Sequence, residues 1–199
     1  MGLREKKALR NRQNIVAEAV KLFKERGFAE TTMESIAEAV ELSPSTLYRY
    51  FPSKDTIVLE SFQSTFDHLT EVFEAQPPSL SIGVALTKAI DAVLRIEDEQ
   101  PEDSLLIRSI IDQSPAARAK LWDHLDDQRA RLGALIAQRL GKATSDFEVV
   151  MSARIAILIV ETAADVWRQS DKSVSSSDIA RDLTRVLAER RESLPDPDA

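Results

Sequence analysis

Residues 31–54 read TTMESIAEAVELSPSTLYRYFPSK, and their pattern carries the clearest structural signal in the chain. Thr31 and Glu34 fit a capping box, in which a threonine is followed three residues later by a glutamate at the start of a helix. Apolar residues then recur at helical spacing, so the pattern predicts a first helix over residues 32–40. Residues 41–42 are left to form a short turn before the next helix signal.

A second and shorter helix follows this turn. Ser43 followed by Pro44 is typical of an N-cap residue and of a proline at the first helical position, where a missing N–H costs nothing. The helix ends at Phe51, because Pro52 disfavours helical geometry in the residue before it. Leu47 is its one aliphatic residue, so we expect it to pack on the first helix while polar side chains face outward. Two short helices joined by a tight turn are typical of a helix-turn-helix, whose second helix reads DNA.

Several residues in and around this stretch carry a resemblance to a known family. They are Phe28, Thr31-Thr32, Ile36-Ala37, Leu42-Ser43, Thr46-Leu47-Tyr48-Arg49-Tyr50-Phe51 and Pro52-Ser53-Lys54. The pattern resembles the N-terminal domain of the TetR family of transcriptional regulators, and the match covers about residues 10–58. It implies an all-α protein with an N-terminal three-helix helix-turn-helix DNA-binding domain and a larger helical domain for effector binding and dimerisation. Glu41 departs from the family, which usually has glycine in this turn, and a non-glycine residue at positive φ would be strained by about 1 kcal/mol.

The candidate DNA-binding residues lie on the second helix and at the starts of helices. We expect Ser45, Thr46 and Tyr48 to set sequence selectivity, because they lie on the exposed face of the reading helix. Thr32 and Lys54 are expected to hold the register on phosphates. The full set is Thr31, Thr32, Ser43, Pro44, Ser45, Thr46, Tyr48, Arg49, Tyr50 and Lys54.

The DNA-binding domain is predicted over residues 1–54. An apolar stripe that ends at Gly27 predicts a supporting helix over residues 9–26. Residues 1–8 resemble the flexible basic arm that some relatives lay along the minor groove. We expect this arm to contact phosphate rather than to read sequence, and a solvated tail is the alternative.

The charge of the chain is divided unevenly. The whole chain has a net charge of −7 at pH 7, with 26 Lys and Arg against 33 Asp and Glu. Residues 1–54 hold ten basic and seven acidic residues, a net of +3, so residues 55–199 hold 16 against 26, a net of −10. A basic DNA-binding domain attracts phosphate, while acidic helix surfaces keep residues 55–199 solvated.

Residues 55–192 are predicted to form the larger helical domain, and residues 193–199 a disordered tail. Helices are indicated over residues 81–98, 101–112, 115–140, 145–169 and 177–190, after a long helix that links the head to this domain. By resemblance, the last two helices of two subunits form a four-helix dimer interface that presents two heads to two half-sites. Candidate interface residues are Ile155, Ile159, Ile179, Leu183, Val186 and Leu187.

The candidate effector-binding residues are Phe66, Arg108, Trp122, Arg154 and Trp167. Aromatic residues at helical spacing occur more often in a core than in a pocket, so a packing role competes with a ligand role. Arg154 and Glu161 interrupt an apolar helix on nearly one face, and they either orient a ligand or pair with polar neighbours. Pairing is the favoured interpretation, because buried charges are usually paired.

The composition argues against other classes of protein. The chain has no cysteine, which excludes a disulfide framework and a thiolate metal site. His68 and His124 are the only histidines, and without a metal-ligand spacing they are expected to be ordinary helix residues. No nucleophile elbow or glycine-rich phosphate loop is present, so neither enzyme activity nor a cofactor or metal is expected.

The sequence also bears on location. The longest apolar run, residues 155–160, is far shorter than a bilayer span, and residues 1–12 lack the apolar stretch of a secretory signal. We therefore expect a cytoplasmic protein that does not bind a membrane. The predicted function is a ligand-responsive repressor that binds a palindromic operator in double-stranded DNA as a homodimer and is released by a small, largely apolar effector. A constitutive or architectural DNA-binding protein without an effector is the alternative.

Overall fold

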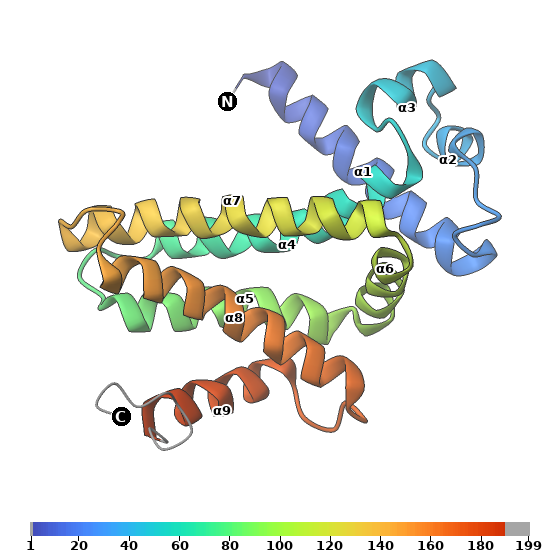
Figure 1. The fold of residues 1–199 in the computed structure, drawn as a ribbon. Coiled ribbons are helices and arrows are strands. Elements are labelled where there is room, and N and C mark those ends of the chain that lie inside the picture. Colours follow the sequence, from blue (N-terminus) through green and yellow to red (C-terminus); the bar gives the residue numbers. More distant parts are fainter. Residues whose placement is uncertain (1, 190–199) are drawn as a thin grey trace. The chain divides into compact units, whose positions relative to one another are not determined.

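The computed structural model describes residues 2–189, and for residues 3–6 it describes the backbone alone. Regular secondary structure in this range is entirely helical, which confirms the expected all-α fold (Figure 1). The helices are α1 (Leu3–Arg26), α2 (Met33–Ala39), α3 (Pro44–Tyr50), α4 (Lys54–Ala75), α5 (Ile82–Glu99), α6 (Pro101–Gln113), α7 (Pro115–Leu140), α8 (Phe147–Gln169) and α9 (Ser176–Glu189).

These helices form two compact units. The first consists of the residues up to Ser64 together with Glu102–Asp123, and the second of Thr65–Pro101 together with the described residues from His124 onward. The first unit therefore takes in α6, whereas the sequence suggested contiguous domains over residues 1–54 and 55–192. The expected disordered tail, residues 193–199, lies outside the described residues.

Helix α1 begins earlier than its apolar stripe indicated. The helix starts at Leu3 rather than near residue 9, so the backbone of residues 3–8 is helical, in contrast to the flexible arm suggested by the sequence. The physical reason is composition, since leucine, arginine, glutamate, lysine and alanine all favour a helix. At the other end, Gly27 follows the helix with φ of +86°, as expected for a glycine that stops a helix.

Helix α2 begins at Thr32 as its N-cap, and not with the capping box predicted from Thr31 and Glu34. The Thr32 hydroxyl accepts a hydrogen bond from the Ser35 backbone N–H at 3.0 Å, and the Ser35 hydroxyl accepts one from the Thr32 N–H at 3.1 Å. The box is therefore shifted by one residue. Serine serves at the third helical position, where the sequence motif favours glutamate or glutamine.

The turn between α2 and α3 keeps a left-handed residue without a glycine. Glu41 has φ of +55°, the conformation that the sequence identified as strained. The Leu42 N–H donates to the Ala37 carbonyl at 2.9 Å, and the Glu41 N–H donates to the Glu38 carbonyl at 3.1 Å. These two bonds form a Schellman motif, whose C′ position is most often glycine. The turn thus has its full set of hydrogen bonds, with the strain located at Glu41.

Helix α3 matches the sequence prediction. Ser43 is its N-cap and accepts from the Thr46 N–H at 3.3 Å, and Pro44 is its first residue. The helix has 7 residues, and Leu47 is its one fully buried side chain. So short a helix has little cohesion of its own, because isolated helices of this length are not stable in water. Its position depends on the contacts made by its neighbours.

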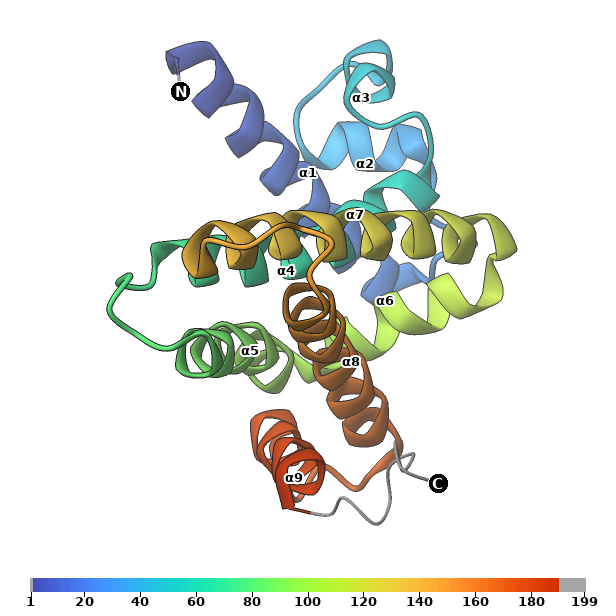
Figure 2. The same ribbon diagram turned by 60° about the vertical axis from the view of Figure 1, so that its left-hand side comes forward.

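In the second unit, α5, α8 and α9 pack against one another (Figures 1 and 2). Arg168 on α8 donates to Glu97 on α5 at 3.0 Å, and both side chains are largely buried. The start of α9 is tied to α5 as well, because the Ser176 N–H donates to Asp98 at 2.8 Å and its hydroxyl donates to the Leu94 carbonyl. The second half of α4 and the second half of α7 join through side-chain hydrogen bonds to Asp67.

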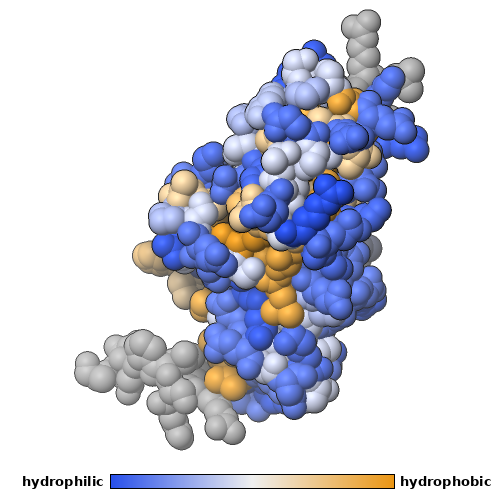
Figure 3. All heavy atoms as spheres, turned by 90° about the vertical axis from the view of Figure 1, so that its right-hand side faces the viewer, coloured by the Kyte–Doolittle hydropathy of each residue, from blue (hydrophilic) through white to orange (hydrophobic). Residues whose placement is uncertain are grey.

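The length and hydropathy of the helices bear on whether the chain crosses a membrane. Hydrophilic residues predominate on the face drawn in Figure 3. Among residues 2–189, no helix combines the length and the apolar character that crossing a bilayer requires. Nor do these residues hold a cluster of histidine, aspartate and glutamate side chains suited to a metal ion.

Candidate nucleic-acid interface

The outward face of α3 is polar, as the sequence predicted. Ser45 and Arg49 are exposed, and the Tyr48 side chain is 45% exposed, whereas Thr46 is half-buried. The hydroxyl of Ser43 lies 3.1 Å from the Ser45 hydroxyl and 2.8 Å from the Thr46 hydroxyl. The result is a face with hydroxyl, phenol and guanidinium groups, which are the donors and acceptors that base edges and phosphates require.

Tyr48 has a partner on α2 that the sequence did not suggest. Its hydroxyl donates to the Glu34 carboxylate at 3.4 Å. Partial desolvation of the phenol, and then the negative charge of Glu34, raise the pKa of Tyr48 above its usual value. A phenol is protonated at neutral pH and donates a hydrogen bond, and the contact with Glu34 favours that form. Glu34 was expected at a helix cap, and only the pairing of α2 with α3 shows that it reaches the reading face.

Two predicted DNA contacts are placed differently from expectation. Thr31 is fully buried, and its hydroxyl donates to the Gly27 carbonyl at 2.8 Å, so it satisfies the end of α1 instead of reaching a phosphate. The Lys54 ammonium donates to the Phe28 carbonyl at 2.6 Å and lies 4.5 Å from the centre of the Phe28 ring. Lys54 therefore holds the turn after α1, through a charge-assisted hydrogen bond and a cation–π contact with Phe28.

Arg12 has a structural role in this region that its basic character in the sequence did not indicate. Its guanidinium donates twice to Glu60 on α4, at 2.8 and 2.6 Å, and once to the backbone carbonyl of Tyr50 at 3.2 Å. It also lies 4.5 Å from the centre of the Phe51 ring. The hydrogen bond to Glu60 is the main cause that raises the pKa of Arg12 above its usual value. One side chain on α1 therefore fixes the end of α3 to α4.

The Tyr50 side chain is also bound by a residue of α1. Its hydroxyl accepts a hydrogen bond from the Asn11 side-chain amide at 3.2 Å, and the residue is half-buried. Thr32, Ser43 and Pro44 are exposed at the starts of α2 and α3. These three residues are thus accessible on α2 and α3 together with Ser45, Tyr48 and Arg49. Tyr50 instead contacts α1.

Helix α6 is linked to the end of α1 within the same compact unit. The Lys24 ammonium lies 2.9 Å from the Asp103 carboxylate and 3.1 Å from that of Glu102. Hydrogen bonds to Asp103 and then to Glu102 raise the pKa of Lys24. The helix dipole favours acidic residues in the first turn of a helix and basic residues in the last turn. Lys24 is in the last turn of α1 and the two carboxylates are in the first turn of α6, so these ion pairs suit both helix ends.

The five candidate effector residues differ in their surroundings. Phe66 and Trp167 are each 3% exposed in the second unit, as packing residues would be. Arg154 is exposed, and Trp122 in the first unit is 60% exposed. Arg108, also in the first unit, donates to Asp112 at 2.9 Å on its own helix. Glu161 lies 3.6 Å from Arg129, in line with the pairing favoured for that carboxylate.

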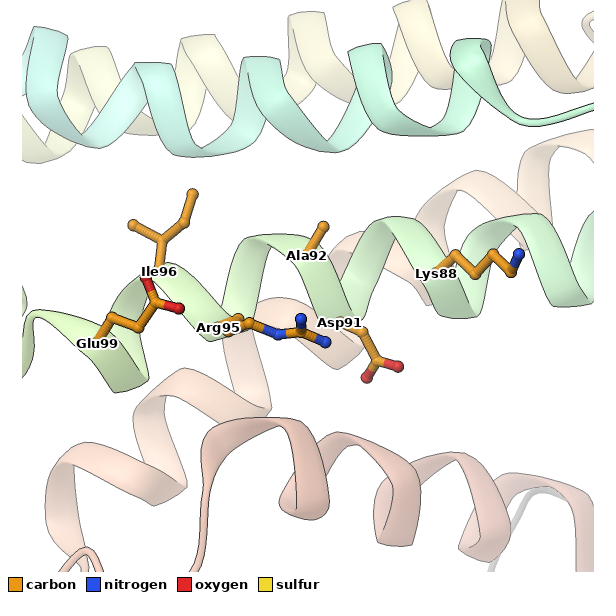
Figure 4. A pocket seen from close by; sticks show the side chains of 6 residues that line it. All are labelled: Lys88, Asp91, Ala92, Arg95, Ile96 and Glu99. Atoms are coloured by element: carbon orange, nitrogen blue, oxygen red, sulfur yellow. The ribbon is translucent and has the colours of Figure 1, made fainter.

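A shallow hollow lies along α5. Its volume is about 330 Å³. Every residue that lines it comes from α5, as Figure 4 shows: Lys88, Asp91, Ala92, Arg95, Ile96 and Glu99. Ligand sites are usually enclosed between elements and mostly apolar, so this charged groove on one helix does not suit a small apolar molecule.

The predicted dimer residues differ in their exposure. Ile159 is 5% exposed and packs inside the subunit, so it does not fit an intersubunit contact. Val186 is 41% exposed, and the other four predicted residues are half-buried. The outer side of α8 adds exposed apolar residues that were not predicted, namely Phe147, Met151 and Leu158, with exposed fractions of 88%, 52% and 53%. Together, α8 and α9 leave several large apolar side chains exposed.

Comparison with known proteins agrees with this architecture. The family model described as bacterial regulatory proteins, tetR family, matches residues 15–60. A second model, the MftR C-terminal domain, matches residues 80–194. The first match covers the helix-turn-helix, and the second covers α5 to α9.

Individual regulators are similar to this chain in sequence or in fold. The chain is 30% identical over 151 residues to the HTH-type transcriptional regulator TcmR of Streptomyces glaucescens, covering 73% of this chain and 67% of TcmR. The fold is similar to that of Salmonella enterica GusR, with 25% identity, a TM-score of 0.61 and coverage of 92% of this chain and 93% of GusR. It is also similar to that of Thermus thermophilus FadR in complex with lauroyl-CoA, with 21% identity, a TM-score of 0.60 and coverage of 94% and 97%. This chain belongs to the TetR family of bacterial transcriptional regulators, and its members are not enzymes.

Proposed function

We propose that this regulator is a cytoplasmic, ligand-responsive repressor that binds a palindromic operator as a homodimer. The observation that carries the proposal is the polar face of α3, with Ser45, Tyr48 and Arg49 exposed while Leu47 is buried. A two-fold dimer of such heads would meet two half-sites about 34 to 36 Å apart, one turn of DNA. The operator would then be palindromic because the protein is symmetric.

Different residues would have different roles on the DNA. Ser45, Thr46, Tyr48 and Arg49 would face base edges in the major groove. Phosphate contacts would come from Thr32 and from exposed cations near the start of α1, such as Arg10. Lys54 is left out of this set, because its ammonium is bound to the carbonyl of Phe28.

The dimer would be formed by α8 and α9. Their support for this role is the exposed apolar side of α8 together with Leu183, Val186 and Leu187 on α9, which the subunit covers only in part. A second copy that presents the same surface would bury both sets at once.

The effector would be a small, largely apolar molecule bound in the second unit. The structural neighbour FadR from Thermus thermophilus holds lauroyl-CoA, and another FadR, from Bacillus subtilis, holds stearoyl-CoA. Ligand binding would change the separation of the two heads and so lower operator affinity, and a tenfold loss requires about 1.4 kcal/mol of coupling.

A constitutive DNA-binding protein without an effector is the second candidate. It is favoured by the exposure of two of the five candidate effector residues, Arg154 and Trp122. Both candidates predict operator binding, and they differ only in whether a metabolite releases it.

One experiment tests the proposal in two steps. Genomic DNA fragments that the purified protein retains would be sequenced, and a shared palindrome is expected among them. Operator binding by fluorescence anisotropy would then be measured with fractionated cell extract. Release by one fraction supports the repressor, whereas retention of random sequence would overturn operator recognition. A shared palindrome that no fraction releases would leave the constitutive regulator.

A further inference from the structure

Three buried side-chain atoms without a hydrogen-bond partner lie on one helix. Among the described residues, these atoms are Nε2 of His124, Oε1 of Gln128 and Nη1 of Arg139, all on α7 in the second unit. Spacings of 4 and 11 residues put the three on the same side of a helix with 3.6 residues per turn. Buried polar atoms are almost always paired, so a helix face that carries three unpaired ones requires an explanation.

The orientation of the Gln128 amide is fixed by its neighbour. Gln128 is 1% exposed, and its Nε2 donates to Asp67 Oδ1 on α4 at 2.7 Å. A carboxylate can only accept, so the amide nitrogen has to face Asp67 and the oxygen has to face away. Arg131 also donates to Asp67 Oδ1 at 2.7 Å, which holds the carboxylate in place. Gln128 Oε1 is therefore a buried acceptor that lacks a donor.

His124 carries the second unpaired atom, close to Gln128 on the same helix. It lies one helical turn before Gln128, at a spacing that makes two side chains neighbours on a helix. A ring nitrogen of histidine either donates or accepts a hydrogen bond. The hydroxyl group of a ligand can donate to an amide oxygen and exchange a second bond with an imidazole, and it brings no charge into the interior.

Arg139 belongs to a different place on the same helix. Eleven residues at 1.5 Å each put it about 16 Å further along α7. Its guanidinium also has other partners, since it donates to the Gln76 carbonyl and lies 4.8 Å from the centre of the Phe73 ring. Arg139 is therefore considered separately from the pair formed by His124 and Gln128.

Apolar residues stand close in sequence to His124, Gln128 and Asp67. Leu125 and Leu132 on α7 and Phe66 and Leu69 on the second half of α4 are all buried. We propose that His124 and Gln128 form the polar anchor of the effector site, and that the effector carries an alcohol or phenol hydroxyl on an otherwise apolar skeleton. This inference rests on the proposed response to an effector, and it specifies the chemistry of that ligand.

The anchor can be tested by direct binding, without DNA. The probes are 4-propylphenol and 1-octanol, each compared with its methyl ether, which keeps the skeleton but cannot donate. Because the chain has only two histidines, NMR of the ¹⁵N-labelled His68→Gln protein reports on His124 alone. We expect at least one hydroxyl probe to shift the His124 resonance and to bind about tenfold or more tightly than its ether, since an unmade buried hydrogen bond costs that much. If neither hydroxyl probe shifts it up to the limit of solubility, or if the ethers bind equally well, the proposal is wrong.

Two substitutions separate an anchor from a packing residue. Gln128→Leu should bring the ratio of alcohol to ether affinity close to one, whereas Arg131→Met, which removes the other bond to Asp67, should preserve it. Gln128→Leu should also unfold at the same denaturant concentration as Arg131→Met or a higher one, because an unpaired buried oxygen is replaced by an apolar group. A ratio that survives Gln128→Leu, or a clearly lower midpoint for that variant, would assign Gln128 to the fold alone.

The outcomes also distinguish this inference from the proposed function. If a probe binds through Gln128 but operator affinity stays constant, the anchor stands and its regulatory role fails. If a cell-extract fraction releases the operator equally from the wild-type and the Gln128→Leu proteins, the response stands and the anchor is wrong.

Discussion

Arg12 binds Glu60 through two parallel hydrogen bonds, from Nε to Oε1 at 2.8 Å and from Nη2 to Oε2 at 2.6 Å. The planar guanidinium matches the carboxylate in a way that an ammonium cannot. Its third nitrogen reaches the carbonyl of Tyr50, where α3 ends. Because α3 has only 7 residues, this contact is a principal means of fixing the angle of the reading helix.

Arg12→Lys should therefore weaken operator binding while keeping the charge. We expect a loss of about 1 kcal/mol or less in unfolding free energy, since the pair is about a third exposed and solvent screens it. The loss in operator affinity should exceed this, because the geometry of α3 changes. Lys21→Met removes a cation from an exposed pair on the same helix and serves as the control. Equal operator affinity for Arg12→Lys and wild type, measured by anisotropy, would contradict the role of Arg12.

Lys54→Ala should lower stability without changing the salt dependence of DNA binding. The ammonium is bound to the Phe28 carbonyl and the Phe28 ring, so its loss should cost about 1 kcal/mol of unfolding free energy. Arg10→Ala, at an exposed position on α1, should instead reduce the slope of log affinity against log salt by about one. A salt titration of both variants checks this, and a reduced slope for Lys54→Ala would restore the phosphate contact expected from the sequence.

Glu41→Asn should stabilise the protein by several tenths of a kcal/mol, up to about 1 kcal/mol. Asparagine tolerates the left-handed conformation that Glu41 adopts at φ of +55°, and it adds less freedom to the unfolded chain than glycine does. Glu41→Gln is the matched control, because it removes the same charge and keeps the strain. Urea denaturation of both variants should place the asparagine variant above the glutamine variant, and the reverse order would argue against strain in this turn.

Leu183→Glu should separate the subunits. The leucine lies half-buried on the α9 face that we assign to the dimer, and a carboxylate there would be costly to bury. Sedimentation should show a monomer with unchanged helical content, and operator affinity should fall because the two half-sites are no longer bound together. Thr184→Glu, one residue along and exposed, should remain dimeric. A dimeric Leu183→Glu protein would place the interface elsewhere.

Glu97 should make stability depend on pH. Burial is the largest influence on this carboxyl, and it raises its pKa above the usual 4.5 despite the opposing effect of Arg168. The folded state then holds the proton more tightly than the unfolded state. The stability that this group contributes is fully present below the unfolded pKa and is lost as pH rises through the folded one. Relative to Glu97→Gln, the wild type should lose unfolding free energy from about pH 4 upward, as urea titrations at several pH values would show. A constant difference would contradict the raised pKa.

Local signals predicted much of the fold and the exposed side of α3. Ser43, Pro44 and Leu47 each act through neighbours in sequence, so the start, end and buried side of α3 could be predicted. The cap of α2 was misassigned because two threonines stand side by side and both have plausible partners. Only the packing of α1 shows that Thr31 is buried beneath Gly27, which leaves Thr32 to form the cap.

Contacts between distant residues could not be predicted in the same way. Arg12 and Glu60 lie 48 residues apart, and Gln128 and Asp67 lie 61 apart, so no periodicity joins them. Lys54 carries the sequence signal of a phosphate contact, and its actual partner is a carbonyl that only the fold brings near. His124 looked ordinary because an unpaired nitrogen is a property of burial, which the sequence pattern of α7 does not reveal.

The contact between Tyr48 and Glu34 has a consequence for how fast an operator is found. Glu34 places a negative charge beside the reading helix, where it repels the phosphates of any DNA, whatever its sequence. Random DNA would then retain the protein only briefly. At a true operator, base contacts outweigh this repulsion. A carboxylate beside Tyr48 is thus expected to shorten each unproductive encounter during the search along a chromosome, with some loss of final affinity.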